Sequence, residues 1–140
     1  MDFQFAEDFK KLTVKCPPNH YKPQNKLVYR WVFDDITDER NFQPEYHKNP
    51  KRCLKFSDKD KCRSLALSFF ISEVQAKNRF SEIKDTNGVK IYKTLGTMVA
   101  ETNINEKDGV NSEPERTGHF SHHLVSGHEY ESRFIIISKL

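Results

Sequence analysis

Large apolar side chains recur at every second position over residues 26–33, KLVYRWVF, and this period predicts a β-strand. One face carries Leu27, Tyr29, Trp31 and Phe33, and the other carries Val28, Arg30 and Val32. We expect the aromatic face to pack into the core. Arg30 is the unusual residue on the other face. A guanidinium between two valines must be paired, reach water at an edge, or bind a ligand.

Similar periodicities predict the other elements. Further strands are expected at residues 63–70, 89–104 with a bend at Gly96, 119–125 and 132–138, and the last is apolar enough to be an inner strand. The main helix is predicted over 72–84, where Ser72 and Gln75 form a capping-box pattern, and a short N-terminal helix is predicted over 5–12. The sequence therefore predicts a single α+β domain over residues 1–140, with a mostly antiparallel, twisted sheet of about five strands.

Composition narrows the class of protein. The chain has 140 residues, of which 31% are charged and 12% are aromatic, as expected for one folded domain with a real core. No window approaches the roughly 18 apolar residues of a membrane span, and the first residues lack the pattern of a signal peptide. We therefore expect a cytosolic protein that does not insert into a membrane.

The three cysteines are Cys16, Cys53 and Cys62, an odd number without any CxxC spacing. In a reducing compartment they are expected to be free thiols. Cys53 and Cys62 together with a histidine would form only part of a zinc site, because structural zinc takes four ligands at short spacings. No metal site is predicted.

Positive charge is concentrated in residues 48–63, KNPKRCLKFSDKDKCR, which hold seven basic and two acidic residues, whereas the whole chain has a net charge of +3. This stretch belongs to a long polar connection, and long irregular segments in small domains are often functional. A local excess of this kind attracts phosphate groups. A solvated loop is the alternative interpretation, and the composition favours it. The candidate nucleic-acid-binding residues are Lys51, Arg52 and Lys55.

Histidines are concentrated in the last quarter of the chain, at His119, His122, His123 and His128. On a strand over 119–125, His119 and His123 would share one face, so that both could reach one zinc ion. General acid–base chemistry on RNA is a second interpretation, with His119 near a phosphate held by the 48–63 stretch. In a third, these histidines are hydrogen-bonded residues of a half-exposed strand.

A different constellation joins three distant residues. Arg30 lies on the first predicted strand, Ser68 lies on a strand entering the main helix, and Glu131 closes a Glu-x-Glu motif before the last strand. In this order the chain resembles the ADP-ribosyltransferases of the Arg–Ser–Glu type. The resemblance implies NAD as cofactor, with Arg30 and Ser68 holding the dinucleotide. Glu131 would then polarise the nicotinamide ribose as positive charge develops on it.

The serine segment departs from that family, because it reads LALSFF instead of Ser-Thr-Ser. Short strings such as LGTMVAETNI and GHFS also resemble segments of small bacterial proteins, which implies no activity. Three hypotheses follow. The protein is an NAD-using transferase of a bacterial stress or defence system, with Arg30, Ser68 and Glu131 as catalytic residues. Alternatively, it is an RNA-binding or metal-independent RNA-cleaving module that uses His119, or it is a non-catalytic binding domain.

Overall fold

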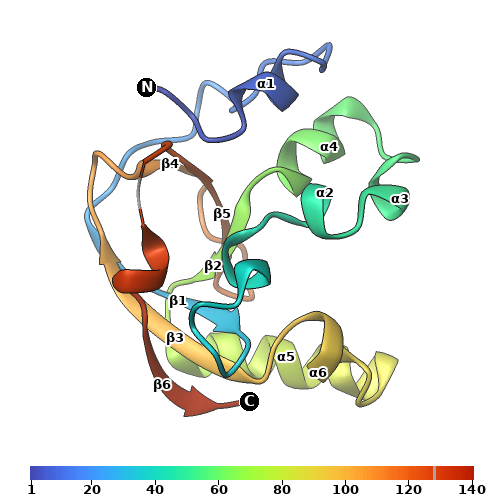
Figure 1. Cartoon of the computed structure of the whole chain (residues 1–140), viewed down its shortest axis with the longest axis vertical. Coiled ribbons are helices and arrows are strands. Elements are labelled where there is room, and N and C mark those ends of the chain that lie inside the picture. The colour runs from blue at the N-terminus through green and yellow to red at the C-terminus, as the bar shows by residue number, and fades with distance from the viewer. Residues whose placement is uncertain (128) are drawn as a thin grey trace.

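Six antiparallel strands form one curved sheet in the computed structural model, which describes residues 1–127 and 129–140 (Figure 1). The strands are β1 (Lys26–Val32), β2 (Leu67–Phe70), β3 (Met98–Ile104), β4 (Gly109–Asn111), β5 (His119–Leu124) and β6 (Ile135–Lys139). Their order across the sheet is β4-β5-β2-β1-β3-β6. The predicted antiparallel α+β architecture is confirmed. The short strand β4 was not predicted, because three residues are too few to show a period.

The main helix is α5 (Glu73–Asn87), as the capping pattern predicted. The Ser72 side chain accepts a hydrogen bond from the Gln75 backbone N–H, and Gly88 ends the helix. The other helices are short: α1 (Ala6–Phe9), η1 (Glu39–Phe42), α2 (Glu45–Lys48), α3 (Pro50–Cys53), α4 (Asp58–Ser64), α6 (Ile91–Thr94) and η2 (Tyr130–Ser132). No helix in the described part of the chain is long and apolar enough to cross a membrane.

Two predicted strands begin later than their patterns indicated. The strand expected from residue 63 starts at Leu67, because the preceding residues complete α4. Ser57 caps that helix, with acidic residues in its first turn and basic residues in its last. Similarly, the first part of the strand expected over 89–104 contains α6. Gly96 adopts a positive φ of 133° against the backbone of Val32, as a bend before β3.

The residues alternate between the two faces of β1 as predicted, but the more deeply buried face is the one that was not expected to pack into the core. Val28, Arg30 and Val32 are the buried residues, whereas Leu27 is 42% exposed and Trp31 is half-buried. Val28 and Val32 belong to the larger core, which also contains Phe69, Phe120 and Phe134. The opposite face is covered by a single helix, α5, which contacts β1. Trp31 still packs there, because its indole N–H donates to the Ala76 carbonyl at 2.9 Å.

The last strand, β6, is an edge strand and not the inner strand predicted. It pairs with β3, and its register shifts between Val99 and Ala100. Ile135 and Ile137 are exposed, at 67% and 37%. Its apolar composition was therefore a poor guide to its position, since alternate isoleucines point away from the protein.

The sheet divides near its middle. β1 and β3 pair along seven residues, but β1 and β2 share only the register pair Tyr29↔Phe70. β2 instead pairs along its whole length with β5. The short helices α2, α3 and α4 lie on one side of this division, as Figure 1 shows. The separation of β1 from β2 therefore leaves room for a pocket between strand residues and these helices.

Candidate functional site

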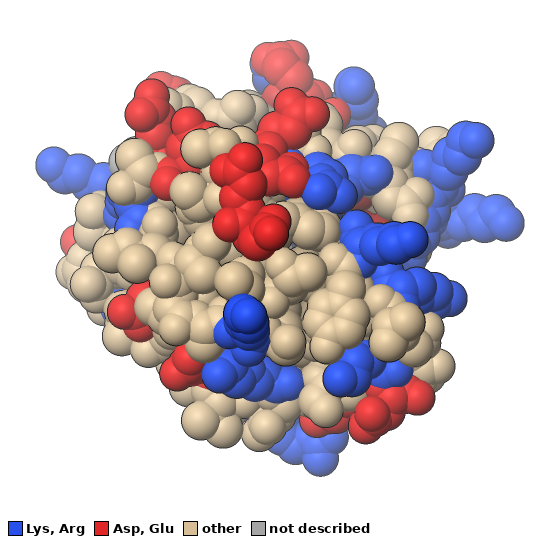
Figure 2. Space-filling model, turned by 60° about the horizontal axis from the view of Figure 1, so that its bottom comes forward, with Lys and Arg blue, Asp and Glu red and all other residues tan. Residues whose placement is uncertain are grey.

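A pocket of about 470 Å³ lies where β1 and β2 separate. This volume is in the range of small-molecule and cofactor sites. Its charged and chemically active lining comes from β1, β2, β5 and the helices α2, α3 and α4: Arg30, Lys48, Arg52, Arg63, Ser68 and His119. Glu45 and Asp60 also line it. The lining therefore has an excess of positive charge. Figure 2 shows many Lys and Arg side chains along the side of the molecule where α3, α4 and α6 lie.

Arg30 is the innermost cation of this pocket, with 6% of the residue exposed. Its Nε donates to the Asn41 carbonyl at 2.7 Å, and its Nη1 donates to the Ser68 carbonyl at 2.9 Å. No carboxylate of the described residues forms an ion pair with it. Burial lowers the pKa of Arg30 to about 10, so the guanidinium stays protonated at neutral pH. The pocket therefore contains a buried positive charge whose partners are neutral.

Lys48 is the second inner cation. Burial lowers the pKa of its ammonium to about 8, with repulsion by Arg30 acting in the same direction and Glu45 acting against it. Arg52 and Arg63 differ from Lys48, because each is neutralised by a carboxylate. Arg52 lies 3.0 Å from Glu45, and Arg63 lies 3.2 Å from Glu115. The unneutralised charge of the pocket is thus concentrated at Arg30 and Lys48.

A serine, a histidine and a glutamate form a hydrogen-bonded row at the edge of the pocket. His119 Nε2 lies 2.9 Å from Ser68 Oγ, and His119 Nδ1 lies 3.3 Å from a carboxylate oxygen of Glu115. Burial lowers the pKa of His119, and Glu115 opposes that shift. A neutral imidazole beside a carboxylate carries its proton on Nδ1, which leaves Nε2 to accept the Ser68 hydroxyl hydrogen.

The structure brings four of the seven predicted site residues to one pocket: Arg30, Ser68, His119 and Arg52. Glu131 does not line it; it lies exposed in η2. Lys51 and Lys55 are exposed and do not line it either. Glu131 does not pair with Arg30 either; the hydrogen-bond partners of Arg30 are the carbonyls of Asn41 and Ser68.

Lys48 and Glu115 are among the residues of this site that sequence reasoning missed. Lys48 lies in the basic stretch, but nothing in the sequence distinguishes it from Lys51. Glu115 lies four residues before His119 in an irregular segment, where no period indicates a contact. Its position depends on a turn, in which the Glu115 N–H donates to the His119 carbonyl and the Gly118 N–H donates to the Glu115 carbonyl.

The other two histidines of β5, His122 and His123, are buried and contact other side chains of the protein. His122 Nδ1 lies 2.7 Å from the Asn111 side-chain oxygen, and its Nε2 lies 2.7 Å from the Tyr130 hydroxyl. Burial lowers its pKa to about 3. His123 packs against the rings of Phe9 and Tyr21, and burial lowers its pKa to about 4. His128 lies outside the described residues.

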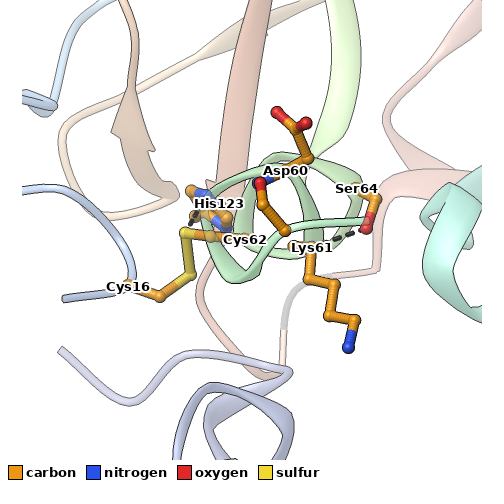
Figure 3. The surroundings of a disulfide bond; sticks show 7 residues. Cys16, Asp60, Lys61, Cys62, Ser64 and His123 are labelled. Carbon is orange, nitrogen blue, oxygen red and sulfur yellow. Dashed lines mark hydrogen bonds between the residues drawn. A yellow bond between two sulfur atoms is a disulfide. The ribbon is translucent and has the colours of Figure 1, made fainter. Parts of the chain in front are cut away.

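The expected free thiols are wrong for two of the three cysteines. Cys16 and Cys62 form a disulfide, which joins the N-terminal segment to α4 (Figure 3). Cys53 is free and buried. Disulfides persist in oxidising compartments, so this bond does not support the expected cytosolic location. The partial zinc set of Cys53 and Cys62 is also excluded in this state, because the Cys62 sulfur is bonded to Cys16.

His123 lies beside that disulfide, as Figure 3 shows, with its Nε2 3.9 Å from the Cys62 sulfur. The donor atoms of Cys16, Cys62 and His123 all lie within 4.8 Å of one another. Two thiolates and an imidazole are ligands that zinc accepts, so reduction of the disulfide would provide three zinc ligands. With the disulfide intact, both sulfur atoms are occupied.

Comparisons of the chain with protein-family models, with curated proteins and with solved structures gave no match. These comparisons neither support nor oppose the resemblance to ADP-ribosyltransferases. Function must therefore be argued from the pocket itself.

Proposed function

We propose that the protein binds a single-stranded nucleic acid and that its cationic pocket holds a phosphate group. The observation that carries this proposal is the buried, unneutralised charge of Arg30. A guanidinium removed from water without a counter-charge costs several kcal/mol, and a bound phosphate would supply that counter-charge. The two carbonyl partners of Arg30 fix the guanidinium in place while leaving further N–H groups for a ligand.

The surroundings of the pocket favour an extended ligand over a free anion. A second cavity of about 770 Å³ shares Lys48 and Arg52 with the first. It adds cations from α6 and the segment before it, Lys90 and Lys93. A row of cations of this kind suits a phosphate backbone, as in grooves that bind single strands. Phe56 lines the first pocket and offers an aromatic face on which a base could stack.

The NAD-using interpretation depends on part of the same pocket. Arg30 and Ser68 both line it, as the resemblance to ADP-ribosyltransferases requires. Glu131, the carboxylate that the resemblance assigns to catalysis, lies in η2 and outside the lining. The nucleic-acid interpretation requires no residue from that region, and we therefore prefer it.

Fluorescence anisotropy with a labelled, unstructured RNA oligonucleotide tests this proposal. We expect binding that weakens steeply with salt, because each neutralised phosphate releases counterions. Arg30→Met and Lys48→Gln should each weaken binding by about tenfold, and Lys48→Gln should reduce the salt slope by about 0.7. Lys51→Gln is the matched control, since it removes the same charge three residues away and outside the pocket.

Two results would overturn the proposal. One is no RNA binding at low salt. The other is an equal loss of affinity in Lys48→Gln and Lys51→Gln, which would mean that surface charge alone attracts the RNA. Titration with NAD⁺ distinguishes the other source of phosphate. NAD⁺ binding that depends on Arg30, in a protein that does not bind RNA, would favour the transferase hypothesis.

A further inference from the structure

We infer that Ser68 is the nucleophile of a phosphodiester transfer, with His119 as its general base and Glu115 as a positioning residue. This inference rests on the proposed binding of nucleic acid, because the bound phosphodiester is the substrate. Ser68 and His119 line the pocket into which Arg30 extends. The reacting hydroxyl would therefore lie beside the charge that holds the phosphate.

The three side chains have the geometry of a nucleophile, a base and a group that orients the base. Ser68 Oγ is 2.9 Å from His119 Nε2, and His119 Nδ1 is 3.3 Å from Glu115. These three roles recur on unrelated folds and are recognised by geometry, not by sequence order. Ser68 is also exposed, so a ligand can reach its hydroxyl.

Secondary structure holds this row in place. Ser68 and Ser121 are register partners on β2 and β5, and Phe70 pairs with His119, so Ser68 and His119 are diagonal neighbours. The turn before β5 brings Glu115 back to His119 through two backbone hydrogen bonds. Gly118 in that turn has a φ of 82°, and a Cβ there would lie 2.6 Å from the Gln75 side chain. The turn therefore requires glycine at this position.

Charge around the row suits the reaction. Burial lowers the pKa of His119, as do Arg63 and Arg79, whereas Glu115 raises it. The imidazole is therefore neutral near pH 7 and able to accept a proton. Arg30, which donates to the Ser68 carbonyl, supplies a fixed positive charge for the negative charge that develops on the phosphoryl oxygens.

The reaction balances without a redox partner. The Ser68 oxygen attacks the phosphorus while its proton moves to His119 Nε2, and the bond between phosphorus and one nucleoside oxygen breaks. That leaving oxygen takes the proton from His119. The other nucleoside stays attached through phosphate to Ser68. Water, deprotonated by His119, then attacks the phosphorus. The bond between phosphorus and Ser68 Oγ breaks, and His119 gives the proton to Ser68 Oγ, which leaves a nucleoside phosphate as product.

Ser64 provides a matched control within the same pocket. It also lines the cavity, but its hydroxyl donates to the Lys61 carbonyl at 2.7 Å, without a histidine partner. A reagent that modifies pocket serines without selection would label both Ser64 and Ser68. One that requires activation by His119 would label Ser68 alone.

The experiment uses bis(4-nitrophenyl) phosphate as the probe, with acid quenching and peptide mass spectrometry. We expect release of 4-nitrophenolate and a nitrophenyl-phosphoryl adduct on the Ser68 peptide. Both should be lost in Ser68→Ala and His119→Gln and kept in Ser64→Ala. Glu115→Gln should slow the reaction about tenfold. It should also move the acid limb of the pH–rate profile to lower pH, because the carboxylate that raises the pKa of His119 is gone.

The experiment distinguishes between failure of the Ser68 nucleophile and failure of the proposed RNA binding. RNA binding by the wild-type protein is measured on the same preparation that is tested for the adduct. The assignment of Ser68 as nucleophile is overturned if the protein binds RNA but forms no adduct. It is also overturned if the adduct persists in Ser68→Ala. An adduct on Ser68 in a protein that does not bind RNA supports the nucleophile and overturns the nucleic-acid proposal. An unshifted pH profile in Glu115→Gln overturns the positioning role.

Discussion

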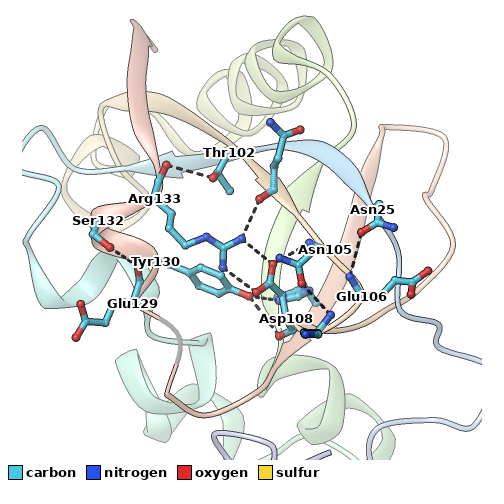
Figure 4. A network of polar contacts seen from close by, with 12 residues as sticks. Asn25, Thr102, Asn105, Glu106, Asp108, Glu129, Tyr130, Ser132 and Arg133 are labelled. Carbon is cyan, nitrogen blue, oxygen red and sulfur yellow. Dashed lines mark hydrogen bonds and ion pairs between the residues drawn. The ribbon is translucent and has the colours of Figure 1, made fainter.

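Arg30 is buried and Arg133 is partly buried, with 27% of its side chain exposed, and the partners of the two arginines differ completely. Arg133 makes two bonds of 2.7 Å to the two carboxylate oxygens of Asp108, as Figure 4 shows. Asp108 is fully buried, and it raises the pKa of Arg133. Arg30 has only carbonyl partners, and burial lowers its pKa. The difference teaches that the charge of Arg133 is balanced within the protein, whereas the buried charge of Arg30 has no counter-charge among the described residues.

The regions around these arginines follow the same division. Near Arg133, the Tyr130 hydroxyl forms hydrogen bonds with His122 Nε2 and with the Asp108 carbonyl. The buried polar groups there are therefore satisfied by one another. Near Arg30, Lys48 and Ser68 face an open pocket. We therefore propose that the region around Arg133 serves stability and that the region around Arg30 serves function.

The largest effect is expected where a balanced charge pair is broken. Arg133→Met leaves the Asp108 carboxylate buried without its cation, and we expect a loss of about 3–5 kcal/mol in the free energy of unfolding. Arg30→Met removes two hydrogen bonds and a charge that has no counter-charge. We expect it to lower the free energy of unfolding by no more than about 2 kcal/mol. Urea denaturation of both variants measures the difference. Equal losses would mean that Arg30 is as structural as Arg133.

The disulfide is expected to have the next largest effect on stability. Cys16 and Cys62 are separated by 46 residues, and the chain-entropy model gives about 4 kcal/mol for a closed loop of this length. Since Cys62 lies on α4, which also carries Arg63 and Ser64 into the pocket, Cys16→Ser should weaken RNA binding as well. Denaturation with and without a dithiol reductant checks the first effect. RNA affinity unaltered in Cys16→Ser would mean that α4 holds its position without the bond.

The next largest effect is a loss of stability at acid pH, which the buried histidines His122 and His123 cause. The folded pKa values of His122 and His123 are about 3 and about 4, below the ordinary value of 6.5. Below pH 6.5 the unfolded chain therefore binds more protons, and stability falls as the pH falls. Each histidine should account for about 2 kcal/mol of the loss between pH 7 and pH 5.

His123→Phe isolates one of these two contributions. Its ring would keep the apolar contacts with Phe9 and Tyr21, so about 2 kcal/mol of the acid-dependent loss should disappear. Urea denaturation at pH 7 and pH 5 measures it, with His119→Gln as the comparison in the pocket. If His119→Gln reduced the pH dependence of stability more than His123→Phe, the pocket would contribute more to stability than the region that contains His122 and His123.

The sequence predicted the fold where local patterns determine it. The period of two over β1 and the Ser72 cap of α5 each depend on neighbouring residues, and both were read correctly. The buried face of β1 was not, because that choice depends on which layers cover the sheet. Large aromatic side chains indicated one face, whereas Val28 and Val32 meet the larger core. The edge position of β6 likewise depends on pairing between distant segments.

The site was predictable only where a residue was chemically unusual by itself. Arg30 was identified because a charge between valines needs a partner, and His119 because histidines gather near it. Glu115 and Lys48 carry no such signal, since their roles arise from a turn and from the division of the sheet. The disulfide could not be predicted either, because an odd number of cysteines does not determine which two pair.

The smallest effect concerns the pH dependence of binding and separates Lys48 from the surface lysines. The pKa of Lys48 is about 8 in the free protein, with Arg30, Arg40 and Glu45 as the charges that act on it. A bound phosphate favours the protonated ammonium and raises that pKa, so binding near pH 8 takes up a proton. RNA affinity should therefore fall by up to about tenfold between pH 7 and pH 9. Calorimetry in two buffers of different ionisation enthalpy measures the uptake, which should vanish in Lys48→Gln and persist in Lys51→Gln. A proton uptake that survived in Lys48→Gln would assign it to another group and remove Lys48 from the phosphate site.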